Sequence, residues 1–258
     1  MLSSCVRSAL ACGGGARLTG RSILTEVRCP PATTAMQMST TAKAETTGIS
    51  GMGQKDKLDL SLKYQDYFGV HNLFTVKDLF DARVHLGHKD TAMDPRMKQF
   101  IFGNRFGQSI IDLDQTTLHL RQALNFLAHI VYRGGIVMFV CRQPQLIHMV
   151  DKAAIDCGEF SFTRRWKSEV FTSPLAAFSQ QVRLPDLVIV LHTKTSDQYA
   201  DHKVVVDAAK VFIPTIGIVD TDCNPNLVTY PVPGNDDSIE SANFYLEMFK
   251  NYPHCQTA

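Results

Sequence analysis

From residue 110 onward, short apolar runs alternate with longer amphipathic segments, and this alternation limits the folds open to the chain. The clearest runs cover residues 136–140, 187–191 and 215–219, and they are apolar at nearly every position. Strands without a polar face are buried on both sides, as in a parallel sheet that helices cover. The sequence therefore predicts an α/β fold in three layers, with a parallel sheet of about five strands flanked by helices.

Residues 110–113 and 160–162 are read as the other two strands of this sheet. Thr75 is the expected N-cap of the first helix, and Asp78 lies in its first turn, where a carboxylate is favourable. The pair Gly134-Gly135 ends the second helix. Apolar residues that recur every three or four positions predict helices over residues 120–131, 146–157 and 239–249. Helices are also expected over residues 76–84 and 198–211, although Val204-Val205-Val206 favours a strand locally.

Positive charge is concentrated in the first 50 residues. They carry five Lys or Arg against two Glu, a net charge of +3, which leaves −2 on the remaining 208 residues. The first 25 residues hold three Arg and no acidic residue, a composition typical of a mitochondrial transit peptide. A disordered cytosolic tail is the alternative. We expect a transit peptide and disordered leader over residues 1–50, an extended or flexible segment over 51–71, one α/β domain over 72–250 and a short tail over 251–258.

The sequence lacks the features of several protein classes. Its overall charge of +1 is too small for a protein held on nucleic acid by bulk charge alone. The longest apolar runs are about six residues, whereas a membrane-spanning helix needs about 20. No glycine-rich phosphate loop follows a strand, no C-x-x-C pair occurs, and His85 and His88 have no third ligand at a fixed spacing. We therefore predict no cofactor, no metal, no membrane span and no small-molecule substrate.

One short motif suggests an enzyme. Asp112, Asp114 and Thr116 form a D-x-D-x-T pattern that resembles the nucleophile motif of haloacid-dehalogenase-type phosphatases. In that chemistry the first Asp attacks phosphorus, the second acts as acid and base, and magnesium neutralises charge. Such sites also need a Ser or Thr after the next strand, where this chain has Cys141 and Arg142. A magnesium-dependent phosphohydrolase that uses Asp112 and Asp114 is kept as the alternative function.

Two longer stretches resemble a known family. The first runs from His85 to Leu113 and includes the segments HLGH, DPRMK and RFG. The second runs from Pro185 to Asp237 and includes IPTIGIVDT and YPVPGNDD. Both resemble the small-subunit ribosomal protein S-two family, in the same order, over roughly residues 72–250. With its cationic leader, the chain looks like a mitochondrial member of that family.

The resemblance implies a flavodoxin-like parallel sheet and a structural role without catalysis. It implies binding to ribosomal RNA and to neighbouring small-subunit proteins in the mitochondrial matrix, in support of subunit assembly and mitochondrial translation. It also assigns Asp112, Asp114 and Asp220 to turns and helix caps. Trp166 is either a flat ring at a cation-rich surface or the apolar anchor of a solvated loop. The candidate RNA contacts are His85, His88, Lys89, Arg96, Lys98, Arg105, Arg164, Arg165 and Lys167.

The chain departs from the bacterial pattern in two places. Bacterial members insert a long helical hairpin before the Pro-Asp strand, but here only residues 170–184 remain, interrupted by Pro174. That segment is too short for a hairpin, so we expect the arm to be missing. Bacterial members also carry basic residues and an aromatic before an Asn-Pro step, where this chain has Thr91-Ala92-Met93 followed by Asp94.

Overall fold

The structure is a computed structural model. It describes residues 61–64, 66–167, 170–175, 179, 182–195 and 200–251. The predicted leader over residues 1–50 and the residues beyond Asn251 lie outside the described part of the chain. Among the described helices, none is both long enough and apolar enough to cross a membrane.

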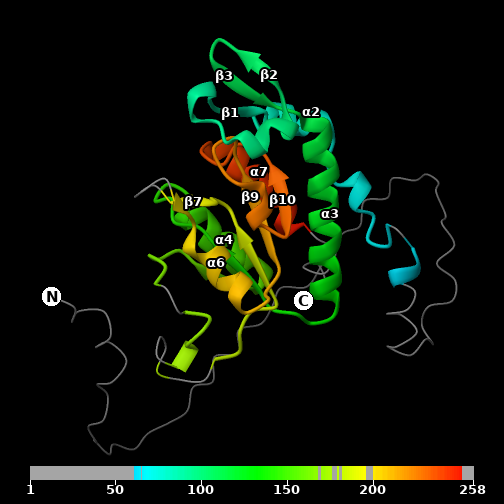
Figure 1. The fold of residues 1–258 in the computed structure, drawn as a ribbon. Helices are drawn as coiled ribbons and strands as arrows, with labels where there is room; N and C mark the ends of the chain where they lie inside the picture. The colour runs from blue at the N-terminus through cyan, green and yellow to red at the C-terminus, as the bar shows by residue number, and fades with distance from the viewer. Residues whose placement is uncertain are drawn as a thin grey trace, which may run out of the picture. The chain divides into compact units, whose positions relative to one another are not determined.

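The centre of the molecule is a parallel sheet of five strands, in agreement with the sequence prediction (Figure 1). Three of its strands lie where the apolar runs predicted them, and the weaker strand at residues 160–162 is also confirmed. The order across the sheet is β10-β9-β6-β4-β5, and every neighbouring pair is parallel. The strands are β4 (Val137–Val140), β5 (Phe160–Phe162), β6 (Leu187–Val190), β9 (Thr215–Val219) and β10 (Tyr230–Pro233).

The fifth strand is β10, which the sequence pattern did not predict. Its sequence is Tyr-Pro-Val-Pro, and proline cannot donate a hydrogen bond to a neighbouring strand. β10 tolerates two prolines because it is an edge strand that pairs only with β9. The residues predicted as the first parallel strand instead form β3 (Gln108–Ile111) in a separate sheet. That assignment was wrong.

β3 is the central strand of a small antiparallel sheet with the order β1-β3-β2. The partner strands are β1 (Leu86–Lys89) and β2 (Ile101–Arg105). β2 and β3 are joined at Phe106-Gly107, where both φ angles are positive, at 54° and 78°. Two successive positive φ angles are typical of the tight turn of a β-hairpin. Because the tight turn pairs β3 with β2, and β1 pairs with the other edge of β3, this strand belongs to the antiparallel sheet instead of the parallel one.

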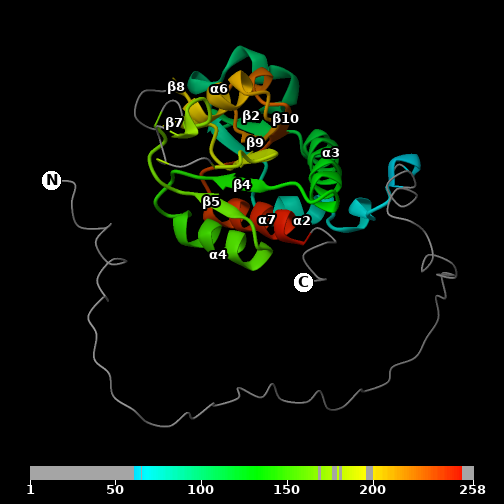
Figure 2. The same ribbon diagram turned by 90° about the horizontal axis from the view of Figure 1, so that it is seen from below.

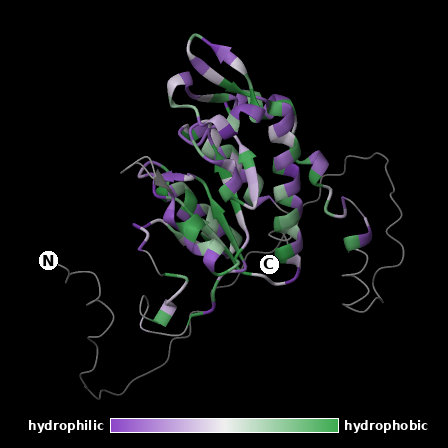
Figure 3. Cartoon of the chain, in the orientation of Figure 1, coloured by the Kyte–Doolittle hydropathy of each residue, from purple (hydrophilic) through white to green (hydrophobic). Residues whose placement is uncertain are grey.

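Helices cover both faces of the parallel sheet, which confirms the three layers (Figure 2). α4 (Ile147–Cys157) and α7 (Ile239–Lys250) lie on one face, where they share one apolar cluster with α3 (Leu113–Tyr132). α6 (Lys203–Lys210) packs on the other face. Figure 3 shows mostly apolar central strands and a mixture of polar and apolar residues along α3, as expected for a helix with one buried side.

Local signals place several helix ends. Thr75 and Asp78 form a reciprocal capping box at the start of α2 (Val76–Asp81), as predicted, although the helix ends three residues early. Gly134 and Gly158 have φ angles of 73° and 72° where α3 and α4 end. α6 begins at Lys203, later than the predicted residue 198, because the His202 side chain caps it there.

Candidate nucleic-acid interface

Four candidate cations lie on the surface of the segment that contains the antiparallel sheet. Lys89 ends β1, Arg105 ends β2, and Arg96 and Lys98 lie in a short 3₁₀ helix, Pro95–Phe100, between these strands. All four side chains are exposed. In the short helix, Met97 and Phe100 are buried. The inward-facing apolar residues hold Arg96 and Lys98 outward, toward solvent.

Strand register brings two of these cations to one face of the sheet. Gln108 of β3 is paired with Lys89 on one side and with Arg105 on the other. Directly paired residues project from the same face of a sheet, so Lys89 and Arg105 flank Gln108 there. The Arg105 guanidinium also lies 5.6 Å from the ring centroid of Phe106, at the hairpin turn. The tip thus combines positive charge with an aromatic ring.

The two candidate histidines have different environments. The His85 ring stacks on Phe80 with 4.5 Å between centroids, and burial lowers the pKa of His85. We therefore expect His85 to be uncharged near neutral pH. His88 lies between two carboxylates, with Nδ1 3.0 Å from Asp220 Oδ2 and Nε2 3.2 Å from Asp237 Oδ2. Hydrogen bonds to Asp220 and Asp237 raise the pKa of His88 to about 11, so its charge is present but locally neutralised.

His88 belongs to a larger network at the carboxyl ends of the parallel strands. His192 Nδ1 lies 2.7 Å from Asp236 Oδ2, and Lys194 Nζ lies 2.7 Å from Asp222 Oδ2. Burial raises the pKa of Asp236 to about 6. Sequence reasoning singled out neither His192 nor Asp236 as part of a site. The available signal was their position, because polar side chains after parallel strands meet at one sheet edge.

This network contains two groups of three side chains whose ligand atoms could hold a metal ion. Within each group, the ligand atoms all lie within 4.8 Å of one another. One set is His88, Asp220 and Asp237, and the other is His192, Asp236 and Asp237. Both nitrogens of His88 already face carboxylates. The arrangement therefore works as an ion-pair network that joins β1 to the loops after β9 and β10.

The second group of candidate cations surrounds a buried tryptophan in the loop after β5. Trp166 packs against Phe162 and Phe171, each with 4.8 Å between centroids. Its Nε1 donates a 2.9 Å hydrogen bond to Asp207 of α6. Trp166 is thus the apolar anchor of the loop rather than an exposed ring. The side chains of Arg164, Arg165 and Lys167 are exposed around this anchor.

The acidic motif that suggested a phosphohydrolase caps a helix. Asp112 Oδ1 accepts a hydrogen bond of 3.1 Å from the backbone N–H of Asp114, at the start of α3. The Thr116 hydroxyl donates to the Pro233 carbonyl, 2.9 Å away, and is buried. Because β3 is outside the parallel sheet, Asp112 does not follow a strand of that sheet. Its capping role is the one that the family resemblance implied.

Comparison with known proteins decides the family. The model of the family described as Ribosomal protein S2 matches residues 79–174 and 167–252. The chain belongs to the ribosomal protein S2 family. The two matched segments overlap at residues 167–174, next to the region where the bacterial hairpin is expected to be missing.

Individual S2-family relatives match most of the chain. It is 50% identical over 189 residues to the small ribosomal subunit protein uS2m of Bos taurus, a match that covers 73% of this chain and 64% of the bovine protein. It is 29% identical over 218 residues to the small ribosomal subunit protein uS2 of Rickettsia bellii, with 67% of this chain and 73% of the relative covered. The uS2 protein of Treponema pallidum is 28% identical over 220 residues, 69% of this chain and 74% of that protein.

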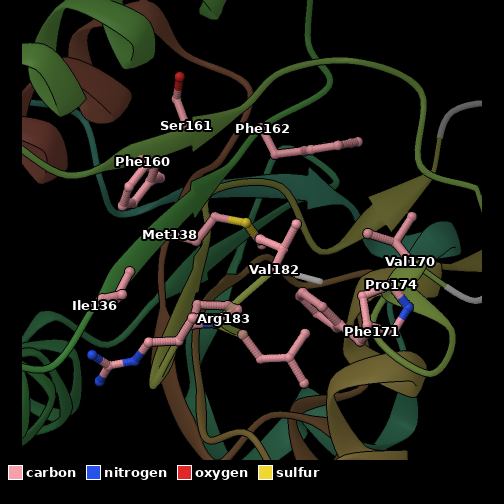
Figure 4. A pocket seen from close by; sticks show the side chains of 12 residues that line it. Ile136, Met138, Phe160, Ser161, Phe162, Val170, Phe171, Pro174, Val182 and Arg183 are labelled. Carbon is pink, nitrogen blue, oxygen red and sulfur yellow. The ribbon is translucent and has the colours of Figure 1, made fainter. Parts of the chain in front are cut away.

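An apolar pocket of about 350 Å³ lies near the region of the missing hairpin in this S2-family chain (Figure 4). Met138 of β4 and Phe160 of β5 form one wall, and Phe171 and Val182 from the segment before β6 form the other. Arg183, at its rim, pairs with Asp186, with Nη2 2.9 Å from Oδ2. The pocket lining contains none of the candidate RNA contacts.

Proposed function

We propose that this chain is a structural, non-catalytic component of the mitochondrial small ribosomal subunit. There it would bind ribosomal RNA and neighbouring ribosomal proteins, in support of subunit assembly and mitochondrial translation. The family match over residues 79–252 carries this proposal. The similarity to bovine uS2m and the cationic, acid-poor leader support the mitochondrial assignment. We infer that residues 1–50 act as the targeting segment, because no other part of the chain has this composition.

We infer that RNA phosphates are contacted by local cations. The net charge of −2 on residues 51–258 cannot attract RNA over a long distance. Exposed Lys89, Arg96, Lys98 and Arg105 are the principal contacts, because their side chains are free of the carboxylates that surround His88. The cations around Trp166 form a second, smaller set. Each phosphate contact lowers the logarithm of affinity by roughly 0.7 to 0.9 per tenfold rise in salt.

The deciding experiment reverses the charge of three of these amino-terminal cations, Arg96, Lys98 and Arg105. Mitochondria are isolated from cells that express the chain with Arg96, Lys98 and Arg105 all replaced by Glu, and their lysate is sedimented through a sucrose gradient. The wild-type chain is expected with the small subunit, and the triple variant with a larger free, light pool. The exposed side chains lie outside both apolar clusters, so the fold is expected to persist.

A matched control reverses three exposed lysines from other surfaces, namely Lys77, Lys152 and Lys203. It changes the net charge by the same amount and is expected to assemble like the wild type. If the first triple variant assembles as well as the control, the amino-terminal segment does not bind RNA. A wild-type chain found only in the light pool would contradict the ribosomal role itself.

A further inference from the structure

A polar pocket opens beneath the tip of the β2–β3 hairpin. Its volume is about 560 Å³, within the range of small-molecule sites. It lies between the hairpin, β1 and the loops that follow β9 and β10. Its wall carries an aromatic ring, a lysine, a histidine and two carboxylates, with few apolar side chains. The residues that matter are His88, Lys89, Phe106, Asp220 and Asp237.

The aromatic ring is held in solvent by the backbone of the turn. Phe106 is 98% exposed, and its φ angle of 54° is rare for a bulky residue. Phe102, on the same hairpin, is 82% exposed. Rings that project beside cations are the groups on which proteins stack unpaired bases. Arg105, 5.6 Å from the Phe106 centroid, supplies such a cation.

The wall of the pocket offers a hydrogen-bond acceptor. Asp237 is 56% exposed at its side chain, and its Oδ2 faces His88. Within the described residues its Oδ1 accepts no hydrogen bond. The lining carries the carboxylates of Asp220 and Asp237 and two cationic side chains, His88 and Lys89, and only His88 pairs with the carboxylates. A pocket without excess positive charge suits an uncharged base better than a phosphate group.

We propose that this pocket binds an unpaired nucleobase of the ribosomal RNA, with guanine preferred. Phe106 stacks on the base, and Asp237 accepts hydrogen bonds from the adjacent N1–H and N2–H groups of guanine. Lys89 and Arg105, on one face of the antiparallel sheet, contact the flanking phosphates. This inference rests on the proposed ribosomal function and names the RNA feature that the amino-terminal segment recognises. The charge pattern favours RNA over an apolar protein segment as the occupant.

The test is guanine footprinting on intact small subunits. Subunits are isolated from cells that express the full chain as wild type, Phe106→Ala, Phe106→Trp or Phe212→Ala. They are then treated with kethoxal, which modifies N1 and N2 of accessible guanines. Phe212 is the matched control: it is 93% exposed with a φ angle of 59°, but it follows α6, far from the hairpin (Figure 1).

One guanine is expected to be protected in the wild type, in Phe106→Trp and in Phe212→Ala. In Phe106→Ala its reactivity should rise to the level of subunits that lack the protein. Once that guanine is located, the purified Phe106→Ala chain should bind the surrounding RNA fragment roughly 5- to 150-fold more weakly, as expected for loss of one stacked base. Circular dichroism melting should show no change in the fold, because the Phe106 side chain is outside the core.

Several results would overturn the proposal. Unchanged guanine protection in Phe106→Ala subunits would exclude stacking by Phe106 but leave the ribosomal role intact. Loss of a crosslink to a neighbouring protein, without any guanine change, would make the tip a protein contact. Micromolar binding of free guanosine monophosphate that Phe106→Ala abolishes would make the ligand a free nucleotide. Absence of the wild-type chain from the subunit would instead refute the proposed function.

Discussion

Replacement of His88 by Gln tests the network that joins the antiparallel sheet to the parallel one. His88 contacts Asp220 and Asp237 at 3.0 and 3.2 Å, and hydrogen bonds to these carboxylates raise its pKa from 6.5 to about 11. Gln keeps a hydrogen-bond donor but removes the charge. Because the Asp220 side chain is buried, we expect a loss of at least about 3 kcal/mol in the free energy of unfolding near pH 7, as for a broken buried ion pair.

The pH dependence gives a sharper expectation than this single value. Between the unfolded pKa of 6.5 and the folded value of about 11, the folded wild type holds one more proton than the unfolded chain. Its stability should therefore fall by about 1.4 kcal/mol per pH unit as the pH rises through this window. The stabilisation is complete below pH 6.5 and is lost as the pH passes about 11. The Gln variant lacks this contribution.

The assay is urea unfolding of both proteins at several pH values from about 7 to about 9. Groups shared by the two proteins, such as the buried thiols, contribute equally and cancel in the difference. NMR of the His88 ring provides an independent readout, since it should stay protonated across this range. Equal pH slopes for the two proteins, or a ring that loses its proton near pH 7, would refute this account of the network.

Two further substitutions test the packing around the candidate interface. Gly87→Ala would place the new Cβ 2.5 Å from Thr221 Cγ2, so thermal melting should show a loss of about 1 to 3 kcal/mol in the free energy of unfolding. Gly103→Ala is the control: a Cβ there would have no atom within 4 Å, so this variant should melt like the wild type. Trp166→Phe removes the hydrogen bond to buried Asp207, and urea unfolding should show a loss of about 1 to 3 kcal/mol. An unchanged midpoint would mean that the indole N–H is not needed to anchor the loop.

The sequence predicted the strands that are fully buried, because a continuous run of apolar residues marks each of them. β6 and β9 are apolar at nearly every position, and their bounds agree with the structure to within one residue. β10 was missed because proline is depleted in strands generally, and only its edge position permits two. β3 was assigned to the wrong sheet because strand order along the chain does not reveal whether a tight hairpin redirects the next strand.

The candidate interface was predictable only in part. The surface exposure of Arg96 and Lys98 follows from the buried residues that alternate with them, which is local information. The neutralisation of His88 depends on Asp220, more than a hundred residues away, and on Asp237. A single sequence carries no signal for such a pairing. Phe106 was part of the family-like segment, but its exposure became evident only from the geometry of the turn.

Hydrogen bonds between the segment around β1, residues 84–94, and the loops after β9 and β10 also set an order of events in folding. The backbone N–H of His88 donates to the Thr221 hydroxyl, that of Asp94 donates to the Thr221 carbonyl, and that of Asn235 donates to the Val84 carbonyl. A chain synthesised or imported from its amino terminus therefore presents residues 84–94 long before their partners arrive. The proposed RNA-contact surface in residues 85–105 is completed only when nearly the whole chain has emerged, so a partial chain lacks the hydrogen bonds that hold this surface in place.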